Sequence, residues 1–461
     1  MPPKTGRLHR AAARFETASL GRVREIFAPG LDLPADFGAP QRKRLLPPAA
    51  TFFLFLAQVL SADGSCRETI LGFLAELFDQ EGKTASPNTA AYCKARARLP
   101  IEEIKGVARG SAHRVEAQGE PWLWKERRVR VADGTGVSMP DTPANQRAWP
   151  QSSKGKPGCS FPVMKLVGLF CLATGALIDI AYGSLAVHEA TLMRTLWPLL
   201  AAGDVLLADR GFCSFADFFL LAKMGVDCVM RKNARRKNSA VIKTLGPNDR
   251  IVEWRKAGVK PKWMDEQTWR ELPESMMVRE VKVNVDVPGF RTQVVWVVTT
   301  LLDHKKYSAA DLAGLYRRRW RVEICFRDIK IAMGMDVLRC KTPAMVEKEL
   351  WMRVIAYNLI RGLMVEAARE HGANPERLSF KGTVAALRQW SPLLAQTATG
   401  SEERSLLYAA LLHYISRDKV PLRPNRVEPR ARKRRPKNYQ LLNKPRREFK
   451  EIMHRNKYRR A

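Results

Sequence analysis

The sequence lacks an apolar run long enough to cross a membrane. Its longest nearly apolar stretch, residues 166–181, is interrupted by Asp179 and contains a turn-like Gly175, and it falls short of the ~20 residues that a spanning helix needs. The start of the chain, Met1 to Phe15, is basic but has no apolar core of the kind found in signal peptides. We therefore expect a cytoplasmic protein with no membrane partner.

Cysteine and histidine occur without any metal-binding pattern. The eight cysteines form no C-x-x-C pair, and the seven histidines show no spacing typical of metal ligands. We therefore expect reduced, mostly buried thiols and no structural zinc.

Acidic residues are few compared with basic ones. The 461 residues include 46 Asp plus Glu against 79 Lys plus Arg, a formal net charge of +33. Hydrophobic residues make up 46 %, enough for real cores in about three domains, so wholesale disorder is excluded. A charge of this size attracts polyanions, and nucleic acid is the expected partner. An acidic membrane surface is the weaker alternative.

The first 125 residues show only helical patterns. Residues 52–78 have helix-like apolar spacing, and Ser86-Pro87 opens a further helix. The segment from Cys66 to Leu99 fits two interpretations about equally well. It is either a helix-turn-helix whose second helix carries Lys94, Arg96 and Arg98 into a DNA groove, or a helix with a basic, solvated face.

From Val129 onward strands and helices alternate. Residues 128–133 alternate like a half-buried strand, residues 164–183 read as two apolar strands, and residues 204–209 form a short buried strand. Helical stretches are expected at residues 189–200 and 215–224. This order indicates an α/β layer domain.

The later half of the chain has three textures. Residues 231–302 carry β-type segments divided by Gly, Pro and Asn, which indicates a β-rich insertion. Long helices follow, one from Ser308 with Asp311 completing a capping box and one from Pro343. The stretch from Arg417 is strongly basic and contains prolines, so we expect a disordered tail that neutralises phosphates without sequence choice.

The helix expected after Ser308 carries a polar, cationic face. The face consists of Tyr316, Arg319, Glu323 and Lys330, with Trp320 and Arg327 near its edge. Because a helix turns by ~100° per residue, the first four side chains fall within roughly a 60° arc. A single carboxylate among cations suits a site that binds metal ions and phosphates together.

Further oxygen ligands would have to come from distant elements. Asp133 and Asp209 each end a strand, and ligand crevices in α/β sheets lie at strand ends. Taken alone, each is explained as well by a turn or an ion pair, and Glu323 by a surface salt bridge; the joint pattern favours a site. The sequence leaves supporting roles open for rival acids nearby, which are Asp141, Asp179, Asp204, Asp217 and Glu189.

The motifs together resemble a known family. The Y-x2-R-x3-E-x6-K spacing from Tyr316 to Lys330, with DGTG at Asp133 and LADRGF around Asp209, is similar to bacterial insertion-sequence transposases of the DDE type. The likeness covers residues 129–364, about half of the chain. That family inserts strands between its second and third acids, and here 323 − 209 leaves a gap of 114 positions.

The resemblance implies a set of site residues. Asp133, Asp209 and Glu323 would be the catalytic acids and would hold two Mg²⁺ ions, for which Mn²⁺ could substitute. The residues expected to contact DNA are Tyr316, Arg319, Lys330, Trp320, Trp296, Arg210 and Arg327.

Two of these residues have a particular expected role. In related transposases an aromatic side chain receives a base flipped out of the stack, and Trp296 and Trp320 are the positions that could do this here. Ordinary core or rim packing explains both tryptophans about equally well. Arg210 would either orient Asp209 or touch DNA.

The resemblance also implies a fold, an α/β protein with an RNase H-like mixed sheet flanked by helices. The expected regions are a helical N-terminal DNA-binding region (1–125), the first part of the catalytic core (126–232), a β-rich insertion (233–302), the second part of the core with the Glu helix (303–375), a C-terminal helical region (376–416) and the basic tail (417–461).

The function implied is that of a cut-and-paste transposase acting on double-stranded DNA. It would cut at the terminal inverted repeats of a mobile element and join the ends to target DNA, as a homodimer in the synaptic complex, in the bacterial cytoplasm and at the nucleoid. The residues leave two alternatives open. One is a metal-dependent nuclease without joining activity, and the other is a non-catalytic DNA-binding derivative of a transposase.

Overall fold

The computed structural model describes residues 46–82, 84–153, 158–233, 239–284, 294–397 and 400–421, with the isolated positions 31, 33, 34, 36–38, 236, 445 and 448. The expected basic tail therefore lies largely outside the described residues, as do residues 1–30 of the expected N-terminal region. None of the helices within the described ranges is long and apolar enough to cross a bilayer.

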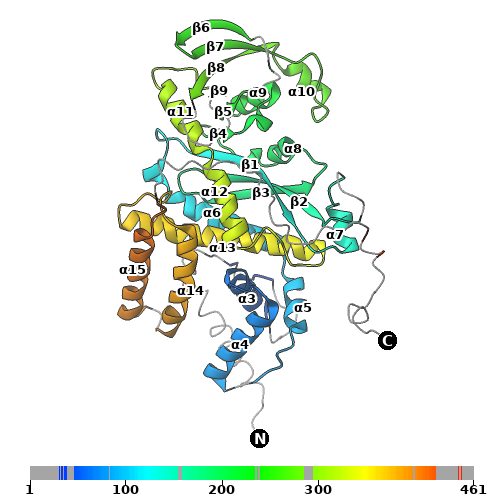
Figure 1. Cartoon of the computed structure of the whole chain (residues 1–461), viewed down its shortest axis with the longest axis vertical. Coiled ribbons are helices and arrows are strands. Elements are labelled where there is room, and N and C mark those ends of the chain that lie inside the picture. Colours follow the sequence, from blue (N-terminus) through cyan, green and yellow to red (C-terminus); the bar gives the residue numbers. More distant parts are fainter. Residues whose placement is uncertain are drawn as a thin grey trace, which may run out of the picture.

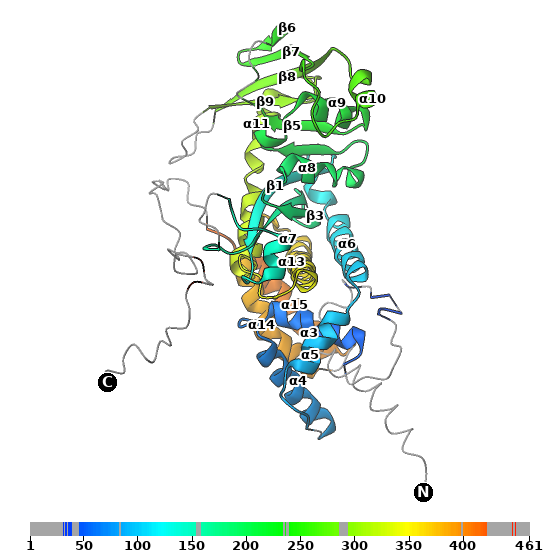
Figure 2. The same cartoon turned by 90° about the vertical axis from the view of Figure 1, so that its right-hand side faces the viewer.

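The described strands form one nine-stranded sheet in the order β3-β2-β1-β4-β5-β9-β8-β7-β6. The first five strands are β1 (Val129–Ser138), β2 (Val163–Cys171), β3 (Leu177–Ser184), β4 (Val205–Ala208) and β5 (Asp227–Arg231). The insertion supplies β6 (Ala240–Gly246), β7 (Asp249–Arg255), β8 (Ser275–Asn284) and β9 (Val294–Thr299). Figure 2 shows these four strands continuing the same sheet beyond β5.

Strand β1 is the centre of the first half of the sheet. Strand β2 runs antiparallel to it on one side and β4 runs parallel to it on the other, with Val131 paired to Leu207. Strand β3 continues antiparallel from β2, and β5 continues parallel from β4. An antiparallel meander extended by parallel strands is the RNase H-like arrangement, so the predicted mixed α/β fold is confirmed.

Helices cover both faces of this half of the sheet. On one face, α8 (Glu189–Arg194) and α9 (Phe215–Lys223) pack with residues such as Ala132 and Ala208. On the other face, α12 (Arg321–Arg327) and α13 (Pro343–Glu370) pack with residues such as Val131 and Val137. Because side chains alternate along a strand, successive residues of β1 contact different layers.

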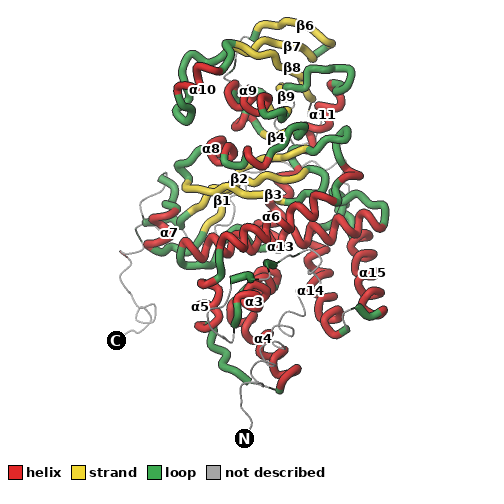
Figure 3. Tube along the Cα trace, turned by 180° about the vertical axis from the view of Figure 1, so that it is seen from behind, coloured by secondary structure: helices red, strands yellow, loops and turns green. Residues whose placement is uncertain are grey.

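Helix α13 separates the sheet from a group of helices at the other end of the molecule (Figures 1 and 3). These helices are α3 (Pro48–Leu60), α4 (Cys66–Glu81), α5 (Ala90–Arg98), α14 (Phe380–Gln396) and α15 (Glu402–Arg417), while α6 (Ile101–Ala117) packs along α13 and β3. The shorter elements are α7 (Pro143–Ala148), α10 (Glu266–Glu271), η2 (Glu120–Trp122) and η3 (Trp197–Leu199).

The helix-turn-helix interpretation of α4 and α5 is wrong for Arg96. Its side chain is buried, donates to Gln58 Oε1 over 3.0 Å, and lies over the rings of Phe55 and Tyr92. The link between the two helices, residues 82–89, is also longer than the turn of three or four residues typical of that motif. The other two cations of α5 are exposed, as the solvated-face interpretation requires.

The continuous helix expected after Ser308 is interrupted. The capping box of Ser308 and Asp311 begins α11 (Ala309–Arg318), as predicted, but α12 starts only at Arg321 and a π-helical turn, η5 (Asp328–Ala332), follows it. Between α11 and α12 the backbone bonds tighten, with the N–H groups of Arg319 and Val322 donating three residues back. The single 60° arc is therefore a wrong prediction, because one helical period does not run through these residues.

Candidate active site

Two of the expected acids meet at the point where β4 ends. Strand β4 is four buried apolar residues between the two helical layers, and Asp209 follows it directly as the residue before η4 (Arg210–Phe212). Asp133 lies in the middle of β1. Extending the parallel register from Val131 and Leu207 by two residues places Asp133 level with Asp209.

The third acid reaches this point from α12, where Arg319 connects it to the strand. Arg319 donates to Glu323 Oε1 over 3.0 Å, and its other terminal nitrogen lies 3.5 Å from Asp133 Oδ2. The arginine side chain is buried, whereas Glu323 is more than half exposed. A guanidinium group therefore lies between the carboxylates of Asp133 and Glu323.

The acids act on one another electrostatically. Burial raises the pKa of Asp133 to about 6, and the carboxylates of Glu323 and Asp209 add to this rise. The Gly134 N–H, which donates to Asp133 Oδ1 over 2.8 Å, and the Arg319 guanidinium act in the opposite direction. Asp133, Asp209, Glu323 and Arg319 thus form one charged cluster, although they come from three separate elements.

Tyr316 and Trp320 extend this cluster on the α11 and α12 side. Tyr316 is buried, and this burial raises the pKa of its hydroxyl, with Arg319 opposing the rise and Asp209 adding to it. Its ring meets Trp320 edge to face at 6.2 Å, and the Arg319 guanidinium lies over the Trp320 ring at 5.3 Å. The Trp320 ring therefore contacts both Arg319 and Tyr316.

Lys330 is anchored to β1 by several contacts. Its Nζ donates to the Gly136 carbonyl over 2.9 Å, lies 3.4 Å from Thr135 Oγ1, and pairs with Asp336 at 2.8 Å. The structure thus places Lys330 on the strand that carries Asp133, a few residues further along. Its expected contact with phosphate remains a prediction.

The remaining expected residues lie apart from the acids or at the surface. Trp296 is on β9, separated from β4 by β5 in the sheet, and the Arg250 guanidinium covers its ring at 4.6 Å. Arg210 is exposed in η4, and Arg327 is exposed at the end of α12, where it pairs with Asp328 at 3.7 Å. Of the two tryptophans, only Trp320 therefore contacts the cluster.

Comparison with known proteins decides the family. The family described as "Transposase DDE domain" matches residues 124–359, which span Asp133, Asp209 and Glu323. The chain belongs to the DDE-domain transposases. The predicted family and the predicted general function of a DNA transposase are thereby confirmed, and transposases are enzymes of the kind that cleave DNA and transfer strands.

Individual relatives agree with this assignment. The transposase is 26 % identical over 358 residues to "Transposase InsG for insertion sequence element IS4" of Escherichia coli K12, covering 76 % of this chain and 77 % of the relative. It is 33 % identical over 64 residues to "Putative transposase InsL for insertion sequence element IS186A" of the same organism, 14 % of this chain and 17 % of that one. The structure of a piggyBac transposase synaptic complex with hairpin DNA aligns over 87 % of this chain and 82 % of that one at 9 % identity, but with a TM-score of only 0.40.

The family implies use of a divalent metal ion, and the donor chemistry of the transposase suits one. Three carboxylates are hard oxygen ligands of the kind preferred by Mg²⁺ and Mn²⁺. As the side chains stand, no three His, Cys, Asp or Glu residues of the described ranges are close enough together to hold a metal ion. Arg319 instead balances the charge of Asp133 and Glu323, so these acids would have to turn away from it to bind a cation.

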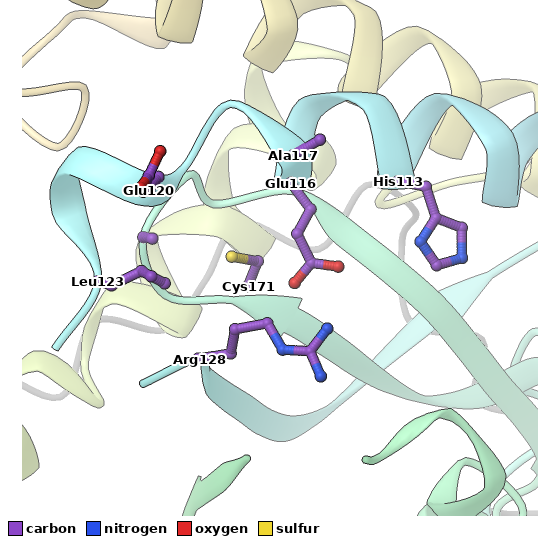
Figure 4. A pocket seen from close by; sticks show the side chains of 8 residues that line it. His113, Glu116, Ala117, Glu120, Leu123, Arg128 and Cys171 are labelled. Atoms are coloured by element: carbon purple, nitrogen blue, oxygen red, sulfur yellow. The ribbon is translucent and has the colours of Figure 1, made fainter. Parts of the chain in front are cut away.

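A cavity of about 330 Å³ lies elsewhere in the transposase, beside α6 (Figure 4). Its lining residues are His113, Glu116, Ala117, Glu120, Leu123, Arg128, Cys171 and Ala173. The charges here are paired internally, because Glu116 bonds to the buried Arg130 and Arg128 pairs with Asp204 at 2.9 Å. No expected site residue lines this cavity, and its Glu116–Arg130 pair links α6 to the sheet.

Proposed function

We propose that Asp133, Asp209 and Glu323 are the catalytic acids and together hold two Mg²⁺ ions, which Mn²⁺ could replace. With them the protein cuts DNA at the terminal inverted repeats of its element and joins the freed ends to target DNA. Two copies, one on each end, would form the synaptic complex. The observation that carries this proposal is that Arg319 contacts both Asp133 and Glu323, while Asp209 is near enough to raise the pKa of Asp133.

The reaction needs charge stabilisation more than covalent chemistry from the protein. Bound Mg²⁺ supplies Lewis acidity at the scissile phosphodiester and balances charge on its entering and leaving oxygens. In the first step water attacks the phosphorus atom and the DNA 3′ oxygen leaves as a hydroxyl. In the later step that hydroxyl attacks a phosphodiester of the target, so one bond forms as another breaks. No covalent intermediate with the protein is required.

Arg319 has two successive roles in this scheme. Before DNA binds, its guanidinium holds the side chains of Asp133 and Glu323 in one place. When not paired with those acids, the guanidinium would donate to the phosphate oxygens of the strand, a charge-assisted contact that arginine makes well. Lys330, anchored to Gly136, would grip phosphate beside it.

The aromatic contacts of the proposed site favour Trp320 over Trp296 as the residue that stacks on a displaced base. Trp320 lies over Arg319 and beside Tyr316, whereas the ring of Trp296 is covered by Arg250. Stacking on tryptophan is largely indifferent to base identity. It would therefore serve any end sequence.

We also propose that the segments outside the catalytic core bind DNA without reading much sequence. Lys94 and Arg98 of α5 are exposed and suited to phosphate contacts. The basic tail would add general affinity. We further propose that the chain is divided into regions at the boundaries expected from the sequence.

The test is cleavage and joining by purified variants of the full chain. The substrate is a plasmid in which the DNA flanking the gene on both sides brackets a marker, with a second, supercoiled plasmid as target. D133N, D209N and E323Q should each reduce cleavage by at least about 10³-fold while DNA affinity stays within about a few-fold, because phosphate contacts remain. E253Q, on β7 of the insertion, is the matched control and should cleave normally.

Two results would overturn the proposal. Normal cleavage by E323Q would remove Glu323 from the site. Cleavage by the unaltered chain without any joined product would instead indicate a nuclease that cannot transfer strands.

A further inference from the structure

An acid on the other helical layer lies close to the strand that carries Asp133. A Cβ atom placed on Gly134 would lie 2.4 Å from Cδ and 2.5 Å from Oε1 of Glu189. Real Cβ atoms essentially never come so close, so only glycine fits at this position while Glu189 stays where it is. The Glu189 carboxylate therefore lies against the backbone next to Asp133.

Several contacts hold Glu189 in this position. It is the first residue of α8, and the side chain of His188 before it accepts the N–H of Ala190 over 3.2 Å. Lys165 of β2 donates to the Leu185 carbonyl over 2.9 Å and so ties the preceding loop to the sheet. Three later residues of α8 are buried in the core. These contacts fix the backbone around Glu189, from which its carboxylate extends toward Gly134.

The edge of β1 at this level is open to both helical layers. Strand β4 ends at Ala208, and the next pairing on that edge within the described residues is the bridge from Ser138 to Val337. Alternation along β1 directs Asp133 toward the α12 layer and position 134 toward the α8 layer. Glu189 therefore reaches, from the α8 side, the same unpaired edge that Asp133 and Asp209 reach from the α12 side.

Among the five rival acids near the site, Glu189 differs from the other four in having no hydrogen-bond or ion-pair partner within the described residues. Asp179 pairs with Arg109, Asp204 with Arg128, Asp217 with Arg194, and Asp141 accepts from Gln146. In the part of the chain that the structure describes, Glu189 makes no hydrogen bond or ion pair, although it is partly buried. A partly buried carboxylate without a cation loses solvation and gains nothing in return.

We propose that Glu189 is a fourth carboxylate of the metal-binding site, contributing an oxygen from the α8 layer to the cations held by Asp133, Asp209 and Glu323. Position 134 is glycine because a side chain would push this carboxylate away from the strand edge. The inference rests on the proposed function. It adds a residue that none of the sequence motifs contains.

The experiment measures Mn²⁺ binding rather than activity. The full chain is saturated with double-stranded DNA and titrated with Mn²⁺, and the free ion is followed by electron paramagnetic resonance. E189Q should weaken Mn²⁺ binding by about 10-fold or more, the range seen when groups around a metal site are removed. D133N should weaken it at least as much, and the charge-matched control E253Q should bind Mn²⁺ like the unaltered chain.

The outcomes separate the two proposals. If D133N loses Mn²⁺ binding while E189Q retains it, the role of Glu189 is wrong and the three-acid site stands. If neither variant differs from the unaltered chain, or if that chain binds no Mn²⁺ at all, both proposals fail. Should E189Q unfold below the temperature of the assay, E189D replaces it, since a shorter side chain keeps the charge but withdraws the oxygen; unaltered binding by E189D would count against the role.

A second variant tests the contact itself. G134A should weaken Mn²⁺ binding by about as much as E189Q, because the new methyl group displaces the carboxylate. Combined with E189A, which removes the obstruction, G134A should cause no further loss of Mn²⁺ affinity and should cost less in thermal stability than it does alone. Equal losses in both backgrounds would show that Gly134 and Glu189 act independently and would contradict the proposed contact.

Discussion

Arg96 among the N-terminal helices and Arg319 at the strand ends are both buried, at 7 % and 6 % exposure. Arg96 is surrounded by uncharged partners, the amide oxygen of Gln58 and the rings of Phe55 and Tyr92. Arg319 instead lies between two carboxylates, Asp133 and Glu323, which we propose to bind metal cations. The difference shows that burial alone does not make an arginine structural, because what matters is whether its partners can exchange it for another cation.

Replacing Arg319 should produce the largest effect on catalysis. R319A should lower the cleavage rate by about 10² to 10³-fold, the usual loss when a donor to a developing charge is removed. R319K should recover little, because an ammonium group lacks the planar fork of a guanidinium. Cleavage rates with the flanking-DNA plasmid check this, with thermal unfolding as the control. A rate within threefold, roughly, of the unaltered chain would place Arg319 in the structural class of Arg96.

Replacing Arg96 should affect stability and leave catalysis unchanged. R96A removes one of the two hydrogen bonds to the buried Gln58 oxygen, which keeps that of Tyr92, and opens space between two aromatic rings. This should lower the free energy of unfolding by about 2 to 4 kcal/mol. Denaturant unfolding measures this. The specific activity of the folded fraction should match that of the unaltered chain. A loss of DNA affinity in the folded protein would revive the interpretation of α5 as a groove-reading helix.

The raised pKa of Asp133 should make metal binding depend on pH. Since a ligand must be deprotonated, Mn²⁺ affinity should fall about tenfold for each pH unit below about 6. The free energy of unfolding should change with pH in the opposite direction. The folded chain binds the Asp133 proton more tightly than the unfolded chain does, so protonated Asp133 stabilises the fold. This stabilisation is complete below pH ~4 and is lost as the pH rises through about 6. Because Arg319 lowers the pKa of Asp133, R319A should move the pH midpoint of Mn²⁺ affinity to higher pH. An unchanged pH midpoint would show that Arg319 does not influence the ionisation of Asp133.

The smallest effect is expected from the exposed cations around the site. R327A should weaken binding to every DNA sequence by a few-fold and reduce the slope of log K against log salt by about one unit. The control is R270A, which replaces another exposed arginine, on α10. Binding assays over a range of salt concentrations measure both. Identical slopes for the two variants would exclude Arg327 from the DNA interface.

Elements that depend on neighbouring residues could be read from the sequence. The capping box of Ser308 and Asp311, the long helix from Pro343, and the strands that meet at Gly175 were all predictable, because capping residues, apolar periodicity and turn glycines act within a few positions of the chain. The motifs also indicated three acids far apart in sequence. Their convergence was an expectation that rested on the family resemblance.

Other features could not be read in this way. The burial of Arg96 depends on α3 and α5 meeting in space, and the interruption after Arg318 allows Arg319 to contact a strand that no local pattern specifies. The contact of Glu189 with Gly134 joins residues whose sequence neighbours carry no sign of each other. The one sequence feature that could indicate this contact is the glycine that follows Asp133. That feature is ambiguous because glycine also occurs in ordinary turns.

The sequence by itself determined the basic character, the order of strands and helices, and the acids and cations available for chemistry, because these follow from composition and local periodicity. Only the tertiary structure decided which acid faces which cation. Strand register, the early end of β4 and the packing of α8 and α12 on opposite faces set those distances, and electrostatic interactions depend on distance and burial rather than on position along the chain.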